Sequence, residues 1–483
     1  MTFTAVQRVF GLLLMMFSLT MLPPVFVSLL YSDGTWIGFT SSLLVILASG
    51  AVLWWPVRTQ RRELRLRDGF LVVALFWVVL SLFGATPLLL VDDPQMGFTD
   101  AVFESASGLT TTGATVLAGL DRLPKAILFY RQQLQWFGGL GIIVLAVAVL
   151  PMLGVGGMQL YRAETPGPVK DAKLTPRITE TAKALWYVYL GITLLCGLAY
   201  WAAGMSVFDA ICHAFSTVAI GGFSTYDSSM GHFNSPLIEM IAVVFMFIAG
   251  INFSLHFLAW RNRRLTDYLL DPEFHAYVRI LGGLIVVVLA YLYWVGHYAT
   301  LSETLTKGLF QVVSIGTTTG FTTDRFAAWP GALPVLLLLS SFVGGCAGST
   351  AGGMKVIRWL LMYKQGVREV QRLVHPSAEI PVKLGAKAVS PRVVESVWGF
   401  FAVYIVIFGI LLIILLATGL DQVSAFAAIA ATLNNLGPGL GDVASGFGGV
   451  SDVAKWSAVC AMLLGRLEIF TLLVLITPTF WRR

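Results

Sequence analysis

The stretch Thr110-Thr111-Thr112-Gly113-Ala114-Thr115 interrupts an apolar sequence, and related stretches return three more times. The others are Ile220-Gly221-Gly222-Phe223-Ser224, Thr317-Thr318-Thr319-Gly320-Phe321-Thr322 and Asn434-Asn435-Leu436-Gly437-Pro438. The intervals between one glycine of each stretch are 109, 98 and 117 residues, counted over Gly113, Gly222, Gly320 and Gly437. Self-similarity at a nearly even spacing is typical of a repeated architecture. We therefore predict a chain built from four related units.

The composition is that of a polytopic membrane protein. Of 483 residues, 57% are hydrophobic and 12% are charged, and the mean hydropathy is +0.80. Soluble globular proteins are much less apolar. Because a helix needs about 20 mostly apolar residues to cross the bilayer core, we expect ten spans, at roughly 9–30, 36–56, 70–91, 132–153, 184–203, 236–259, 276–297, 331–361, 395–418 and 455–478.

The distribution of lysine and arginine predicts the orientation of the chain. Of 32 such residues, 25 fall in the termini and one set of loops, six fall in the opposite loops, and Arg466 lies inside a span. Positively charged short loops stay in the cytoplasm. We expect both termini to be cytoplasmic and the glycine stretches to lie on the outer side. The net charge of +6 follows from this loop bias and does not indicate nucleic-acid binding.

The predicted domains are an N-terminal two-helix hairpin and four repeats. In each repeat a span is followed by a short apolar stretch, a glycine stretch and a second span. A segment of about a dozen apolar residues is too short to cross the membrane and is expected to be re-entrant. We predict an all-α fold of ten transmembrane helices and four re-entrant pore helices and loops, in pseudo-symmetric repeats around one pore. The predicted bounds are 1–68, 69–161, 162–264, 265–392 and 393–483.

Polar residues stand at matching positions before the glycines. Asp100 and Asp209 lie thirteen residues before Gly113 and Gly222, where Lys307 and Ser424 stand in the other repeats. The carboxylates could be ion ligands or proton carriers, but we expect them to cap the short helices and meet their positive dipole ends. Glu104 and His213, within the short helices, are expected to be hydrogen-bonded buried groups, with proton transfer as the alternative. The position six residues before the glycine holds Ser107, Ser216, Ser314 and Ala431.

The glycine stretches suit a cation path. A channel replaces the hydration shell of a cation with rings of carbonyl oxygens, and four loops supply four oxygens per ring. Turning successive carbonyls toward one axis requires a backbone conformation that glycine adopts readily. Pore helices that enter from outside direct their negative C-terminal ends at the ion. A single such stretch is an ordinary turn, whereas four in equivalent places indicate a pore.

Several motifs resemble a known family. LTTTGAT, AIGGFST, TTTGFTT and LNNLGPGLG, together with QWFGGLGIIVLAVAVLP, GGCAGSTAGGMKVIR and GRLEIFTLLVL, resemble the TrkH/TrkG branch of the Trk/Ktr/HKT superfamily of potassium transporters over essentially the full length. The resemblance implies an inner-membrane potassium permease, homodimeric and gated by a cytoplasmic nucleotide-binding subunit of the TrkA type. It also implies potassium binding by the backbone of Thr111, Thr112, Gly113, Ile220, Gly221, Gly222, Thr318, Thr319, Gly320, Asn435, Leu436 and Gly437. No loop carries T-V-G-Y-G, so we expect weaker discrimination against sodium than in tetrameric potassium channels.

A glycine-rich run interrupts the second span of the third repeat. It contains Gly344, Gly345, Gly348, Ser349, Thr350, Gly352 and Gly353. Met354 separates it from Lys355, so it lacks the Gly-Lys-Ser/Thr arrangement of a phosphate loop. Small residues could serve close helix packing, but five glycines in ten positions favour local unwinding into a cavity. The resemblance implies a mobile gate at this position.

Arg466 and the segment Tyr363–Pro391 each have two interpretations. A cation within a span faces a partner or a water-filled path, so Arg466 is either in a salt bridge to another span or, as the resemblance implies, an electrostatic barrier below the glycine loops. Glu468 is two residues away and would not face it. The basic segment Tyr363–Pro391 is either a headgroup contact or a docking surface for the gating partner.

Two mechanisms remain open from the sequence. One is channel-like potassium movement down the electrochemical gradient. The other is symport coupled to protons or sodium, which would need an intramembrane titratable group such as Glu104, His213 or Glu468. No set of residues indicates an enzyme, and we expect no organic cofactor, with K⁺ as the transported ion.

Overall fold

The computed structural model describes residues 3–59, 66–141, 178–467 and 469–481, and all structural statements below concern these residues. They are predominantly helical, which confirms the predicted all-helical membrane protein. Six helices are long and apolar enough to cross a membrane: Thr4–Tyr31, Trp36–Val57, Asp68–Leu90, Ala182–Ala202, Pro272–Val295 and Pro391–Ala417.

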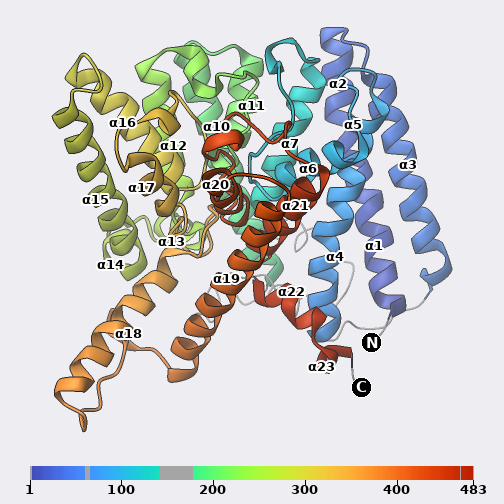
Figure 1. Ribbon diagram of the computed structural model, residues 1–483. Helices are drawn as coiled ribbons and strands as arrows, with labels where there is room; N and C mark the ends of the chain where they lie inside the picture. The colour runs from blue at the N-terminus through green and yellow to red at the C-terminus, as the bar shows by residue number, and fades with distance from the viewer. Residues whose placement is uncertain (1–2, 60–65, 142–177, 468, 482–483) are drawn as a thin grey trace.

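The first two spans form a helical hairpin. α1 (Phe3–Ser18) continues through one 3₁₀ turn into α2 (Leu22–Tyr31), and α3 (Trp36–Trp54) returns beside them (Figure 1). A Cβ on Gly11 would lie 2.8 Å from the carbonyl oxygen of Gly50, and a Cβ on Gly50 would lie equally close to the carbonyl oxygen of Gly11. Small residues that let two backbones approach in this way favour helix packing in lipid.

After the hairpin, one order of elements recurs four times: a long helix, a short helix, a glycine loop and a further helix. The first two sets comprise α4 (Leu66–Gly84), α5 (Thr86–Leu90), α6 (Phe98–Leu109) and α7 (Lys125–Leu140), then α10 (Ile178–Ala202), α11 (Val207–Val218), α12 (Pro236–Ala249), α13 (Phe253–Asn262) and α14 (Thr266–Leu270). The third comprises α15 (Pro272–Val295), α16 (Leu301–Gly316), α17 (Leu333–Ser340) and α18 (Val356–Val374), with strands β1 (Lys383–Leu384) and β2 (Lys387–Ala388) paired antiparallel. The fourth comprises α19 (Pro391–Ala417), α20 (Gln422–Leu433), α21 (Asp452–Arg466), α22 (Ile469–Ile476) and α23 (Pro478–Trp481).

The predicted number of ten continuous spans is not confirmed. The expected span 236–259 is divided into α12 and α13, which are bent by 91°. The span 331–361 is divided into α17 and α18, as the glycine-rich run predicted, and the span 455–478 into α21 and α22. Within the span 132–153, α7 ends at Leu140, and residues from 142 onward lie outside the described ranges.

The four short helices α6, α11, α16 and α20 end inside the protein, and three of them begin at a capping side chain. Ser206, Thr300 and Asp421 accept hydrogen bonds from the first turns of α11, α16 and α20. Asp100 and Asp209 lie in the first turns of α6 and α11, at the positive dipole ends as predicted, but the predicted capping is wrong because both occupy the third helical position. Asp100 instead forms an ion pair with Lys455 of α21 at 2.7 Å, and Asp209 accepts from Ser206 Oγ at 2.7 Å.

The helices form a bundle from which one hairpin projects. The α1–α3 hairpin packs at one edge against α4, and α20 and α6 lie toward the middle (Figure 1). α18 and the first part of α19 extend away from the bundle at the end where α1 begins and α23 ends. The two larger apolar cores lie around the hairpin and α4 and around the elements from α10 onward, and a smaller one joins α18 to the start of α19.

The turn of the N-terminal hairpin is fastened to α7 by Asp33. Its carboxylate accepts hydrogen bonds from the backbone N–H of Thr35 at 3.1 Å and of Ala126 at 2.9 Å, and from the hydroxyls of Ser28 and Thr35. Burial alone would raise the pKa of Asp33, but the bonds from Ser28, Ala126 and Thr35 outweigh it and lower the pKa. The ionised form therefore stabilises the contact between hairpin and α7.

We predict that Asp33→Asn destabilises the protein by about 1–2 kcal/mol at pH 7, the lower part of the range for hydrogen bonds to charged groups, because the site is partly exposed. A lowered pKa gives stability that is present above the unfolded pKa near 4 and is lost as pH falls through the folded value. Thermal unfolding in detergent should show a difference from wild type that shrinks with acidification. Asp92→Asn, at an exposed loop position, is the control. Equal melting temperatures at pH 7 would contradict the prediction.

Candidate functional site

The short helices α6, α11, α16 and α20 end in the same way. The second residue after each helix is left-handed, with φ of +55° at Thr111, +54° at Ile220, +69° at Thr318 and +52° at Asn435. In each case its N–H bonds to the carbonyl three residues back, at 3.0–3.2 Å, and the next N–H bonds to the carbonyl five residues back, at 2.8–2.9 Å. This is the Schellman arrangement. The carbonyls five residues back belong to Ser107, Ser216, Ser314 and Ala431. These are the residues that stand six positions before the glycine in each repeat.

The left-handed position carries side chains that are unfavourable there. A Schellman ending usually has glycine at this position, and a β-branched residue with positive φ is an outlier. Thr111, Ile220 and Thr318 are β-branched. Each such conformation costs about 1–3 kcal/mol and persists only where its surroundings hold it, typically at functional sites.

The four loops close into a ring. Gly113, Gly222, Gly320 and Gly437 have φ between +78° and +99°. A Cβ on Gly113 would overlap the carbonyl oxygen of Gly221 in the second loop, one on Gly222 that of Thr319, and one on Gly320 that of Leu436. A Cβ on Gly437 would lie 2.6 Å from the carbonyl oxygen of Thr112, which returns to the first loop. Each predicted glycine therefore lies against the carbonyl preceding the glycine of the next loop.

The ring is rich in buried carbonyl oxygens without protein donors. Three residues per loop were predicted as ion-lining, and all twelve are buried or nearly so. Gly221 O accepts a hydrogen bond from Gln135 Nε2 at 2.6 Å. In the described part of the chain no protein group donates to the other eleven carbonyls. Buried carbonyls normally have a partner, and the C-terminal ends of four helices add negative potential. The ring is thus chemically suited to a cation.

Side chains of α7 support the second loop, which the sequence prediction missed. Gln135 Oε1 accepts from the N–H of Phe223 at 3.1 Å, and Gln132 Nε2 donates to the carbonyl of Phe223 at 3.2 Å. In the fourth loop, Asn435 Nδ2 donates to Thr112 Oγ1 at 3.0 Å and to the carbonyl of Met462 at 3.0 Å. The sequence did contain a feature that pointed to this support: the polar residues between Arg131 and Gln135 at the start of an apolar span. Polar groups within a span are usually functional.

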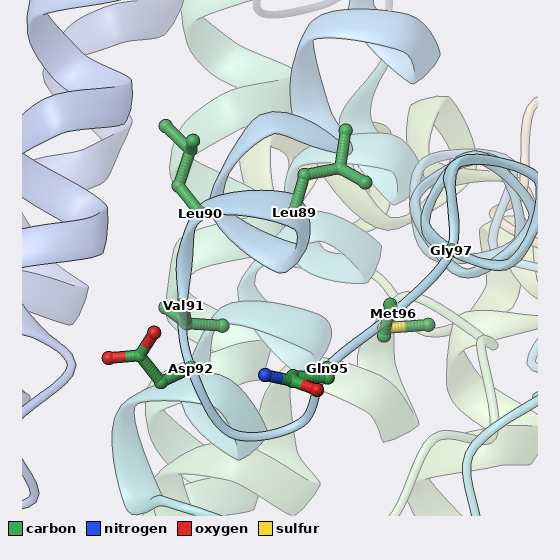
Figure 2. Close-up of a pocket in the computed structure, with 7 residues that line it drawn as sticks. All are labelled: Leu89, Leu90, Val91, Asp92, Gln95, Met96 and Gly97. Carbon is green, nitrogen blue, oxygen red and sulfur yellow. The ribbon is translucent and has the colours of Figure 1, made fainter.

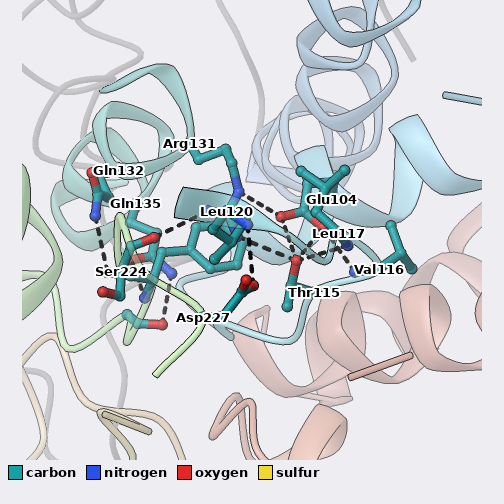
Figure 3. Close-up of polar contacts among 12 residues, drawn as sticks. Glu104, Thr115, Val116, Leu117, Leu120, Arg131, Gln132, Gln135, Ser224 and Asp227 are labelled. Atoms are coloured by element: carbon teal, nitrogen blue, oxygen red, sulfur yellow. Dashed lines mark hydrogen bonds and ion pairs between the residues drawn. The ribbon is translucent and has the colours of Figure 1, made fainter. Parts of the chain in front are cut away.

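Glu104 and His213 are hydrogen-bonded buried groups, as expected. Glu104 pairs with Arg131 Nε at 2.7 Å (Figure 3). His213 contacts the carbonyl of Asp209 through Nδ1 at 2.9 Å and Ser224 Oγ through Nε2 at 3.0 Å. Neither is free to move without breaking these contacts. Glu468, the third group considered for proton transfer, lies outside the described residues.

The glycine-rich run lies directly against the glycine loops. The N–H of Gly352 donates to Thr318 Oγ1 at 2.7 Å, and the N–H of Gly353 to the carbonyl of Asn434 at 3.0 Å. Thr350 Oγ1 donates to the carbonyl of Val218, at the end of α11, at 2.9 Å. The run therefore contacts the ends of three of the four short helices. Gly344, Gly348 and Gly353 within it have left-handed φ values.

Further contacts hold the run in place. The N–H of Cys346 donates to the carbonyl of Gly250, at the bend between α12 and α13, at 2.8 Å, and the N–H of Phe253 donates to the carbonyl of Gly348 at 3.0 Å. Arg466 donates to the carbonyl of Thr350 at 3.1 Å and to that of Gly138, in α7, at 2.6 Å. Arg466 thus joins the glycine-rich run to α7 of the first set.

A shallow hollow lies elsewhere, at the end of α5. It has a volume of about 440 Å³ and is lined by Leu89, Leu90, Val91, Asp92, Gln95, Met96 and Gly97 (Figure 2). Its lining includes no residue of the glycine loops and one charged side chain, that of Asp92. It offers no convergent set of polar groups comparable with the ring.

Four short helices that end in one ring of buried carbonyls, between apolar spans, define a pore-loop membrane transport protein. Residues 37–482 match the family model TrkH, described as a cation transport protein. The chain belongs to the TrkH family, which confirms the resemblance read from its motifs.

Relatives and a solved structure are similar along the full length. The chain is 58% identical over 483 residues to the Trk system potassium uptake protein TrkH of Halomonas elongata, covering 100% of both, and 56% identical over 482 residues to TrkH of Escherichia coli K12, again 100% of both. It is 42% identical to the Trk system potassium uptake protein TrkG of Escherichia coli K12, covering 99% and 98%. The crystal structure of the potassium transporter TrkH from Vibrio parahaemolyticus superposes with a TM-score of 0.91 at 56% identity, covering 100% of each chain. These relatives are named as transporters, not enzymes.

We predict that Gly222→Ala is far more damaging than Gly119→Ala. Both glycines have positive φ, but a Cβ on Gly119 meets nothing within 4 Å whereas one on Gly222 would overlap Thr319 O. Gly119→Ala should cost about 1–2 kcal/mol, from backbone conformation alone. Gly222→Ala should lower the melting temperature further and abolish cation flux into proteoliposomes. Similar losses in the two variants would argue against a closed ring.

Proposed function

We propose that this protein takes up potassium through the ring of glycine loops, in a channel-like manner. The observation that carries the proposal is the closed ring of carbonyls at the negative ends of four helices, eleven of the twelve without a donor among the described residues. Rings of this kind replace the hydration shell of a cation. The naming of full-length relatives as potassium uptake proteins supports potassium as the ion.

The ion contacts are assigned to three residues in each loop. They are Thr111, Thr112 and Gly113, Ile220, Gly221 and Gly222, Thr318, Thr319 and Gly320, and Asn435, Leu436 and Gly437. The four loops differ in sequence, and Gly221 O already accepts a hydrogen bond from Gln135. Unequal loops give fewer well-formed rings, so discrimination against sodium is weaker than in a symmetric tetramer.

The glycine-rich run with Arg466 acts as the gate. Its contacts with Thr318, Asn434 and Val218 support this role, because an ion that leaves the ring would have to displace it. Arg466 both fastens the run through Thr350 O and contributes a positive charge to the path. The observed arrangement corresponds to the closed state.

The projecting helix α18 supports assembly with partners. Tyr363, Val367, Val370 and Val374 are exposed along it at intervals of four, three and four residues, the spacing of a helix–helix seam. This surface suits a homodimer and a cytoplasmic nucleotide-binding subunit of the TrkA type better than a headgroup contact, which would not need the apolar row.

The protein then lies in a bacterial inner membrane with both termini and α18 in the cytoplasm. Its units are the hairpin 1–68 and the repeats 69–161, 162–264, 265–392 and 393–483.

Proton- or sodium-coupled symport is the alternative. It has less support, because Glu104 is held by Arg131 and His213 by Asp209 O and Ser224. Currents through single molecules in a pure lipid bilayer distinguish the two mechanisms. An obligate symporter gives no such conductance.

Gly113→Ser should raise sodium flux relative to potassium flux, because any side chain at this position displaces the carbonyl of Gly221. The check is the ratio of potassium, rubidium and sodium fluxes into proteoliposomes, with and without the cytoplasmic partner. An unchanged ratio in a well-folded Gly113→Ser protein would remove the assignment of the ring as the selective element.

Arg466→Ala should increase basal potassium conductance several-fold without altering the flux ratios, because it releases the run and removes a positive charge from the path. Lys307→Gln serves as the control, since Lys307 pairs with Glu239 at 2.6 Å and does not contact the run. Equal basal currents in Arg466→Ala and wild type, measured in planar bilayers, would count against the gate.

A further inference from the structure

Behind the first glycine loop lies a fully buried ion pair that the proposed conduction path does not use. Glu104 of α6 and Arg131 of α7 are 2.7 Å apart, with side chains 0% and 1% exposed. Isolated buried charges are very costly, and a buried pair becomes tolerable only with good geometry and further hydrogen bonds. The pair meets that condition through its contacts with the glycine loops.

Both oxygens of Glu104 are engaged by the residues that follow the first loop. Thr115 Oγ1 donates toward Glu104 Oε1 and Oε2 at 2.9 and 3.0 Å, and the N–H of Val116 donates to Oε2 at 3.0 Å. The segment leaving Gly113 is therefore fixed to its own pore helix (Figure 3).

Arg131 extends the contact to the second unit, and Thr115 extends it to the fourth. Its Nη1 donates to the carbonyl of Ser224, two residues after Gly222, at 3.2 Å, and its guanidinium stacks over Phe223 at 4.1 Å. Its Nη2 donates to Thr115 Oγ1 at 3.2 Å. The carbonyl of Thr115 in turn accepts from the N–H of Phe447 in the fourth repeat at 2.7 Å. A planar guanidinium with five donors can hold several acceptors in one geometry.

The corresponding positions in the other repeats have weaker equivalents. Glu104, His213, Gln311 and Ala428 each lie nine residues before the glycine of their loop. His213 reaches Ser224 with one bond at 3.0 Å. Gln311 is fully buried, and neither polar atom of its amide has a partner in the described part of the chain. Ala428 has no polar group. The support behind the loops is thus concentrated in the first two repeats.

We infer that Glu104 and Arg131 are positioning residues that set cation discrimination by fixing the outer ends of the first two glycine loops. The inference rests on the proposed function of the ring. It differs from that function because neither side chain contacts the ion, and both act through Thr115, Val116 and Ser224. Removing the pair should let the outer ends of the first two loops move. The protein should then distinguish less well between potassium, rubidium and sodium while still conducting them.

The test uses the full-length protein in proteoliposomes and measures potassium, rubidium and sodium fluxes. Glu104→Gln leaves a buried cation unpaired and could fail to fold, so the double variant Glu104→Gln with Arg131→Gln, which removes both charges, is measured beside it. The ratio of potassium to sodium flux should fall about fivefold or more in the double variant, which corresponds to about 1 kcal/mol of lost discrimination.

The matched control is Glu239→Gln with Lys307→Gln. This pair also joins a short helix to a flanking helix, at 2.6 Å, but contacts no glycine loop. It should leave the flux ratio at the wild-type value. A wild-type ratio in a folded Glu104/Arg131 double variant would overturn the inference, and so would an equal fall in both double variants. If Gly113→Ser changes the ratio while the Glu104/Arg131 variant does not, the inference fails and the proposed function stands. If Gly113→Ser changes nothing, the proposed function itself fails.

Discussion

The structure depends on keeping four glycine loops packed against one another, each glycine against a carbonyl of the next loop. Such a ring is unfavourable by itself, since eleven of its twelve carbonyls lack a donor in the described part of the chain and each loop holds one side-chain-bearing residue in a left-handed conformation. Its surroundings hold it together. Glu104 and Arg131 brace the first two loops, and Asn435 joins the fourth loop to the first. Two ion pairs, Asp100 with Lys455 and Lys307 with Glu239, tie the fourth unit to the first and the third to the second.

In these two ion pairs the acidic and basic residues have changed places. Asp100 and Lys307 occupy the same position, thirteen residues before the glycine, but one is acidic and the other basic, and each has the opposite charge on its partner. Like charges facing each other would be repulsive. A short helix of one unit therefore could not replace its counterpart without placing two like charges together. The repeats have become specific to their places in the ring.

The sequence predicted the helical class and the four glycine loops, but not all the breaks in the spans or the contacts between units. The spacing of Gly113, Gly222, Gly320 and Gly437 predicted four loops, and five glycines in ten residues predicted the interruption between α17 and α18. Partners hundreds of residues apart left no local signal, so Asp100 was interpreted as a cap although it pairs with Lys455. The bend of 91° after Ala249 was missed because α12 and α13 together have the length and composition of one span. Arg131 is one of the six basic residues that the sequence placed in the loops opposite the termini, yet it is buried, because its partner Glu104 comes from another helix.

The order in which the ring closes has a consequence for biosynthesis. Asn435 and Thr112, whose side chains bond across the first and fourth loops, are separated by 323 residues. Membrane proteins of this size fold as their segments are made, from the N-terminus onward. The first loop is then made before the last unit, and the neighbours that hold Thr111 in its left-handed conformation are not yet present. During that interval the first loop lacks its contact with the fourth, so a chain that ends before the fourth repeat cannot close the ring.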